Sequence, residues 1–220
     1  SSLRCLPQRL HRRRPVASGG RNDRQRLHPV DLQRAHPAPE RRGIRFAVPG
    51  AGVRTIRPST ALPAITDPAV IDATSQPGYA GQPLIELDGT NAGNVNGLYI
   101  TGGNTTVRGL AINRFSAYGI RLRTGGGNVI EANFIGTDAT GTTAAPNSQD
   151  GVYVQDSPNN TIGGFTSTAR NVISGNADDG ITISGSASTG NLVVGNYLGT
   201  DKSGTLGVGN GGDGVILHTG

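Results

Sequence analysis

The chain has 220 residues, of which 34% are apolar and 4% aromatic, whereas glycine alone supplies 35 residues. This composition is typical of a chain rich in turns and small side chains, and it argues against a domain of amphipathic helices. No apolar run is long enough to span a membrane, no signal-peptide pattern is present, and the single cysteine, Cys5, excludes an intrachain disulfide. Because the sequence lacks an initial Met and stops within a repeat, we expect it to be a fragment of a longer protein.

The net charge of +5 is unevenly distributed along the chain. Residues 1–45 contain 12 Arg and 3 acidic residues, whereas residues 46–220 contain 8 basic and 12 acidic residues. Residues 1–43 are rich in Arg and Pro and show neither a strand nor a helix period. We interpret them as out-of-frame or otherwise non-native sequence, with a native disordered arm as the alternative. Clustered Arg also suits nucleic acid, but no aromatic interleaving or known motif accompanies it, so we expect no nucleic-acid partner.

Short runs of strand-forming residues begin at residue 44. They read IRFAV, VRTI, AVIDA and LIELD, and Pro and Gly separate them. Such spacing predicts strands of about four residues. We expect residues 44–96 to form a β-rich lead-in that caps the following repeats.

Residues 97–220 contain a repeat. The tetrapeptides GIRL, GVYV, GITI and GVIL begin at Gly119, Gly151, Gly180 and Gly214, which are 32, 29 and 34 residues apart. Their alternation of apolar and variable side chains predicts half-buried strands. Two further short strands, each introduced by Asn, follow in each interval, as in NVI and NFI or NLV and NYL. Each repeat therefore contains three short strands.

Strands this short are stable only when they pair with others. Stacking identical repeats pairs each strand in parallel with its counterpart and places Ile, Leu and Val in a continuous column. We therefore predict an all-β chain whose residues 97–220 form a parallel β-helix with three strands per coil, truncated at the C-terminus. An open last coil would leave unpaired strand edges, so end-to-end self-association is expected.

Glycine and asparagine recur at the corners of the predicted coils. Both residue types adopt positive φ at little cost, so we expect Gly before the first strand and Asn before the others to occupy such bends. Repeated Asn side chains can also hydrogen-bond between stacked strands. We interpret Asn133, Asn176 and Asn196 as a structural ladder.

The repeat also resembles a known family. Segments such as GVYVQDSPNNTIGG, RNVISGN and GNGGDGV are similar to the right-handed parallel β-helix repeat proteins of large bacterial surface and secreted polypeptides, which share the pectate-lyase-like superfamily fold. The similarity is dense over residues 97–220, and the preceding segment resembles the lead-in of the same proteins. The resemblance implies a right-handed coil and an extracellular or cell-surface location in a bacterium.

The superfamily includes enzymes, so a pair of neighbouring acidic residues is a candidate catalytic site. Polygalacturonase-like enzymes use such a pair, and Asp178 and Asp179 are the candidates here. The Gly-His-Gly and Arg-Ile-Lys motifs that accompany the pair in those enzymes are missing. Because Asp150 and Asp213 occupy the equivalent place in neighbouring repeats, Asp179 has the pattern of a turn residue. We therefore expect no catalytic residue in this chain.

Two further sets of residues are candidates for binding. Asp150, Asp179 and Asp213 each precede a repeat glycine, so their oxygens could bind Ca²⁺ at one corner; the alternative is that each Asp caps a turn. We expect no other cofactor. Arg121, Tyr153 and Thr182 are predicted to lie in a row on an outward face, where they could contact a polysaccharide or cell-surface glycan or be merely exposed to solvent.

Together these patterns predict a non-catalytic structural or adhesive β-helix module of a secreted or cell-surface bacterial protein, with polysaccharide as the candidate ligand. The alternative is a fragment of a carbohydrate-active enzyme, either a polysaccharide lyase or a glycoside hydrolase, whose site lies on coils outside this sequence.

Overall fold

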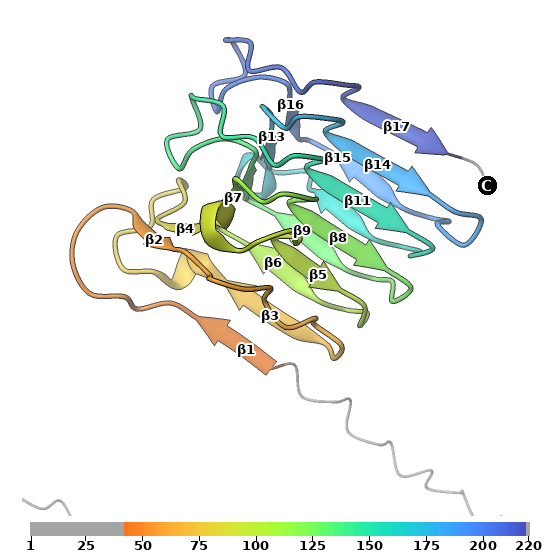
Figure 1. Ribbon diagram of the computed structural model, residues 1–220, viewed down its shortest axis with the longest axis horizontal. Coiled ribbons are helices and arrows are strands. Elements are labelled where there is room, and N and C mark those ends of the chain that lie inside the picture. The colour runs from red at the N-terminus through yellow and green to blue at the C-terminus, as the bar shows by residue number, and fades with distance from the viewer. Residues whose placement is uncertain (1–41, 219–220) are drawn as a thin grey trace, which may run out of the picture. The chain divides into compact units, whose positions relative to one another are not determined.

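A computed structural model describes residues 42–218. These residues form a solenoid in which short strands stack coil upon coil (Figure 1). Each full coil contributes one strand to each of three parallel sheets, A, B and C, so the predicted all-β parallel β-helix with three strands per coil is confirmed. Residues 1–41 lie outside the described part, and the interpretation of the Arg/Pro-rich segment stays a prediction.

The three sheets contain 17 strands and run in coil order. Sheet A contains β1 (Arg42–Arg45), β3 (Ala69–Asp72), β6 (Thr106–Arg108), β9 (Val129–Glu131), β12 (Thr161–Gly163) and β15 (Leu192–Val194). Sheet B contains β2 (Arg54–Ile56), β4 (Ile85–Asp88), β7 (Leu110–Asn113), β10 (Phe134–Ile135), β13 (Val172–Ile173) and β16 (Tyr197–Leu198). Sheet C contains β5 (Leu98–Ile100), β8 (Ile120–Arg123), β11 (Val152–Gln155), β14 (Ile181–Ser184) and β17 (Val215–His218). Three short 3₁₀ helices interrupt the turns: η1 (Ala73–Ser75), η2 (Gly89–Asn91) and η3 (Ser167–Ala169).

The segment expected to be a lead-in supplies strands to the same sheets as the repeats. Strands β3 and β4 pair in parallel with β6 and β7. In the first coil, sheet C is represented only by a single bridge between Ile65 and Ile100. No helix in the described residues is long and apolar enough to cross a membrane.

The core follows from the alternation within each strand. In sheet C, Ile120, Val152 and Ile181 pair in register, and all three side chains are fully buried. Within a strand, the residues that alternate with these buried ones point outward; Tyr153, for example, is half-exposed. Each buried Ile or Val contributes about 1.5–3 kcal/mol relative to an exposed side chain, so the stacked columns stabilise strands that are too short to persist alone.

The corners differ from the prediction in one respect. Positive φ falls on the residue before the corner Asn, as at Ala132 (φ 57°) and Asn159 (φ 56°), and not on Asn133. The glycines that open the sheet C strands also have ordinary φ. They are needed because a Cβ at Gly119 would lie 2.7 Å from the carbonyl oxygen of Gly151 in the next coil. Close approach between coils, rather than backbone handedness, therefore accounts for glycine at that position.

Asparagine side chains form three columns along the solenoid, because each amide bonds to the Asn of the next coil. Every Asn in a column also donates its side-chain amide to a backbone carbonyl, as Asn133 Nδ2 does to Val107 O at 3.0 Å. Asn133 and Asn196 share a column, whereas Asn176 belongs to a different one. The columns are Asn128, Asn160 and Asn191; Asn133, Asn171 and Asn196; and Asn147, Asn176 and Asn210.

Candidate functional site

The outward face of sheet C carries a row of mostly polar and aromatic side chains that ends at Ile216. The parallel register places Tyr99, Arg121, Tyr153, Thr182 and Ile216 next to one another on successive coils. Arg121, Tyr153 and Thr182, the three candidates for ligand binding, therefore do lie side by side, but Thr182 is only 3% exposed. Its hydroxyl is directed to Asp179, so it is not free to contact a ligand. The row exists because each residue is the second of its strand and the strands stack without offset.

Arg121 lies at the centre of an aromatic cluster. Its guanidinium carbon is 5.5 Å from the ring centroid of Tyr99 and 5.6 Å from those of Tyr118 and Tyr153. The rings of Tyr118 and Tyr153 stack, with centroids 4.5 Å apart and planes 8° from parallel. Arg121 also donates to Gln155 Oε1 at 2.7 Å, which holds the guanidinium in place. The result is a fixed, half-exposed surface of aromatic rings around one cation.

Three carboxylates lie together beside this cluster. Oxygens of Asp150, Asp178 and Asp179 all lie within 4.8 Å of one another, and Asp150 is only 5% exposed. Asp179 accepts from Thr182 Oγ1 at 3.2 Å and from the backbone amide of Asp213 at 2.6 Å. The predicted calcium set of Asp150, Asp179 and Asp213 is thus only partly brought together, since Asp178 supplies the third carboxylate and Asp213 supplies an amide.

Burial and charge shift the ionisation of this group. Burial raises the pKa of Asp150, and the carboxylates of Asp178 and Asp179 raise it further, against a hydrogen bond from Thr182 that lowers it. Burial also raises the pKa of the Tyr118 hydroxyl, with Asp150 as the next cause. The group can accept hydrogen bonds from sugar hydroxyls or bind a hard cation. In the described residues no histidine or cysteine joins these carboxylates.

Tyr118 and Asp178 were not singled out for binding from the sequence, although a signal for Tyr118 exists. Tyr118 precedes Gly119 just as Asp150 precedes Gly151, so both residues occupy the same corner on successive coils. Tyr118 therefore occupies the repeat position that Asp occupies in the following coils. Asp178 reaches the cluster from the turn before that position, which the repeat pattern alone does not indicate.

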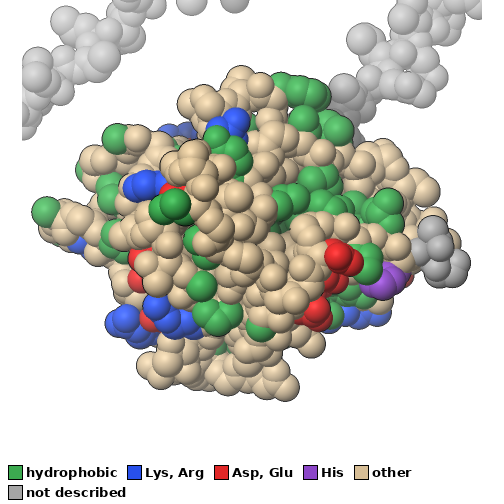
Figure 2. Space-filling model, turned by 90° about the horizontal axis from the view of Figure 1, so that it is seen from above, with side chains coloured by type: hydrophobic (Ala, Val, Ile, Leu, Met, Phe, Trp, Pro, Cys, Tyr) green, Lys and Arg blue, Asp and Glu red, His purple; other side chains and the backbone are tan. Residues whose placement is uncertain are grey.

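The last coil leaves an open end. Strands β15, β16 and β17 are the edges of their sheets, and Leu192, Val215 and Leu217 are 41%, 41% and 68% exposed. Figure 2 looks onto this end and shows hydrophobic side chains there, with a group of acidic ones nearby. Within the described part of the chain, backbone groups without a strand partner and apolar side chains therefore occur together at one face.

Comparison with protein-family models, with curated proteins and with solved structures finds no match to this chain.

Proposed function

We propose that this chain is a non-catalytic structural or adhesive β-helix module that binds polysaccharide along the outward face of sheet C. The observation that supports this most is the cluster of Tyr99, Tyr118 and Tyr153 around Arg121. Aromatic faces pack against the C–H groups of sugar rings, and a guanidinium donates to hydroxyl or carboxylate oxygens. A row that crosses several coils suits a linear polymer better than a small molecule.

The repeats support a place for this module in a larger protein. Their similarity to the pectate-lyase-like β-helix proteins of bacterial surfaces and secretions is the basis for proposing an extracellular or cell-surface location. A rigid solenoid with a binding row along one face would there serve as a stalk or as an adhesive surface.

The carboxylate group favours a second candidate function. Asp150, whose pKa is raised by burial, lies against Asp178 and Asp179, so carboxyl groups in different environments meet at one corner. Such a combination serves as general acid and base in glycoside cleavage. The chain would then be part of a polysaccharide lyase or glycoside hydrolase.

Calcium is proposed as a ligand of the same carboxylates. Three carboxylates provide oxygen ligands, and Ca²⁺ would neutralise their repulsion. A bound cation could also bridge an acidic polysaccharide to the protein, which would make retention of polygalacturonate or alginate dependent on Ca²⁺.

The test is a retention assay with the full chain. Polygalacturonate, alginate, xylan and cellulose are immobilised, and retention and chain cleavage are followed with Ca²⁺ or with EDTA. We expect retention without cleavage, and Tyr153→Ala should weaken it about three- to tenfold because it removes one stacked ring. Phe165→Ala is the matched control, since Phe165 is an aromatic residue 86% exposed outside this face.

The outcomes separate the two functions. Cleavage that is lost in the double variant Asp178→Asn/Asp179→Asn would establish the enzyme and refute the non-catalytic module. Equal retention of the Tyr153→Ala and Phe165→Ala variants would refute the sheet C face as the binding surface.

A further inference from the structure

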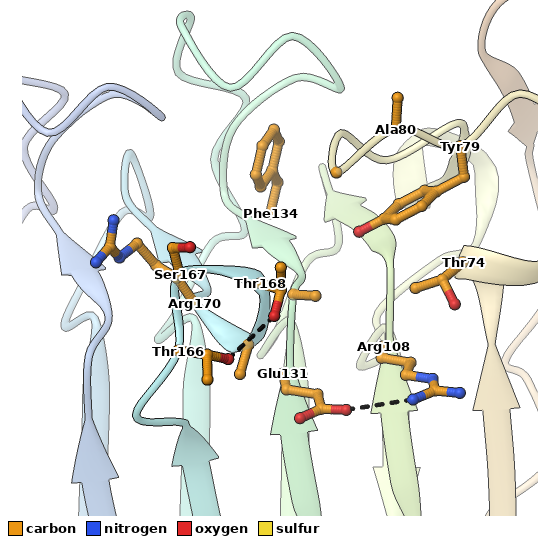
Figure 3. A pocket seen from close by; sticks show the side chains of 13 residues that line it. Thr74, Tyr79, Ala80, Arg108, Glu131, Phe134, Thr166, Ser167, Thr168 and Arg170 are labelled. Atoms are coloured by element: carbon orange, nitrogen blue, oxygen red, sulfur yellow. Dashed lines mark hydrogen bonds and ion pairs between the residues drawn. The ribbon is translucent and has the colours of Figure 1, made fainter.

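A pocket of about 600 Å³ lies at the corner between sheets A and B, away from the sheet C row (Figure 3). Its lining comes from the ends of β6 and β9, from β10, from η1 and the loop after it, and from the loop that contains η3. Pockets that hold small ligands span about 300–1,000 Å³, so this one is large enough for a sugar unit or two.

The walls of the pocket are held in place. Phe134 is 6% exposed and packs with Ala111 and Val172 in a small apolar cluster. The η3 loop is anchored at Arg170, whose guanidinium carbon lies 4.1 Å from the Tyr197 ring centroid and whose Nε donates to Gly195 O at 2.9 Å. Across the pocket, Tyr79 points its hydroxyl toward the interior (Figure 3). An aromatic ring and a fixed polar loop therefore face each other.

The charges of the pocket are balanced within the protein. Arg108 forms an ion pair with Asp72 at 2.8 Å, and its other terminal nitrogen lies 3.6 Å from Glu131 Oε1. Arg170 lies over Tyr197, as described above. Because Asp72 and Glu131 compensate Arg108, the pocket offers little net attraction to an anionic ligand.

The Arg108–Glu131 pair nevertheless keeps the capacity to bond to a ligand. A separation of 3.6 Å is longer than a hydrogen bond, and both side chains are partly exposed, at 39% and 26%. A guanidinium only donates and an ionised carboxylate only accepts. A group that bridges the two must therefore both accept and donate, which is the property of a hydroxyl. The Tyr79 and Ser167 hydroxyls also have no hydrogen-bond partner among residues 42–218. Each hydroxyl is therefore a further group that can bond to a ligand.

We propose that this pocket binds a neutral sugar of one or two units. Vicinal hydroxyls bridge Arg108 and Glu131, the ring packs against Tyr79, and the Ser167 hydroxyl bonds from the η3 loop. The site belongs to sheets A and B, so it is independent of polysaccharide binding on sheet C.

The test is a titration of the full chain with neutral and charged sugars. Calorimetry and saturation-transfer NMR are run with glucose, galactose, mannose, xylose, N-acetylglucosamine, cellobiose and maltose, and with galacturonate as the charged comparison. We expect at least one neutral sugar to bind, and Glu131→Gln and Tyr79→Ala each to weaken it about tenfold through loss of a charge-assisted hydrogen bond or of the stacking ring. The control variant Leu206→Ala, whose side chain is 64% exposed and lies outside both sites, should leave this binding unchanged.

Three outcomes would overturn the proposal. They are the absence of binding by every neutral sugar, tighter binding of galacturonate, and equal affinities in the wild type and both pocket variants. Circular dichroism establishes that each variant is folded. Among residues 42–218 the Glu131 side chain makes only the 3.6 Å ion pair, so Glu131→Gln should fold even where Tyr79→Ala does not.

Discussion

The asparagine column that contains Asn133 should be essential to the stability of the solenoid. Asn133 is fully buried. Its Oδ1 accepts from Leu110 N at 3.1 Å, and its Nδ2 donates to Val107 O at 3.0 Å. In Asn133→Ala both backbone groups lose these partners, while Asn171 Oδ1 still accepts from the Asn133 backbone amide at 2.9 Å.

The expected loss follows from those two groups. Val107 and Leu110 are fully buried, so water cannot replace the missing amide without a rearrangement. An unsatisfied buried polar group costs about 1–3 kcal/mol, which predicts a destabilisation of about 2–6 kcal/mol. That is a large part of a typical domain stability of about 5–15 kcal/mol.

Equilibrium unfolding in urea, followed by far-ultraviolet circular dichroism, measures this loss. The matched control is Asn196→Ala in the last rung of the same column, where the half-buried Asn196 Nδ2 donates to Ile162 O at 2.8 Å. Because Asn196 itself is partly exposed, water can enter the space that its side chain leaves and bond to Ile162 O, so we expect a loss of about 1 kcal/mol. Equal losses for the two variants, or a loss below about 1 kcal/mol for Asn133→Ala, would refute the reasoning.

Three further predictions follow from charge and from the open end. The Arg108 hydrogen bond, with help from Thr74, holds the pKa of Asp72 at about 2, below the ordinary 3.8. About 1–2 kcal/mol of stability present above pH 4 should therefore disappear as the pH falls toward 2, and Arg108→Gln should reduce this component in acid-unfolding curves. Because burial and neighbouring carboxylates raise the pKa of Asp150, its ionisation destabilises the fold as the pH rises above 3.8. In thermal melts the Asp150→Asn variant should therefore be more stable than the wild type at pH 7, with a smaller gain in stability at pH 4. An equal gain at the two pH values would contradict this prediction. Sedimentation velocity should show concentration-dependent association that Leu217→Lys reduces, whereas a monomer at all concentrations would exclude end-to-end pairing.

Much of the architecture could be predicted from the sequence, because a solenoid is specified by short-range repetition. The alternation in Val152 and Val154 identifies the buried face of a strand, and the spacing of Gly119, Gly151 and Gly180 gives the length of a coil. Parallel stacking then follows, since strands of about four residues have no other way to bury their apolar side chains.

The division of asparagines into three columns needed the tertiary structure. Asn133 and Asn176 look equivalent in sequence, but coils differ in loop length, and only the stacking shows which corner each occupies. The reason for glycine at the sheet C strands was likewise hidden, because the carbonyl that excludes a Cβ at Gly119 belongs to the next coil, 32 residues later.

The candidate sites also include residues that the sequence predicts and residues that only the tertiary structure places. The sequence alone determined the row of Arg121, Tyr153 and Thr182, since strand register transmits a repeat position directly into space. Only the tertiary structure added Tyr118 and Asp178 to that face and closed the pocket beside the paired strand residues Arg108 and Glu131. The reason is that Tyr118, Asp178 and the other pocket walls come from turns and loops whose paths vary between coils. Repetition predicts what lies on the strands, whereas the insertions between them are placed by packing against coils distant in sequence.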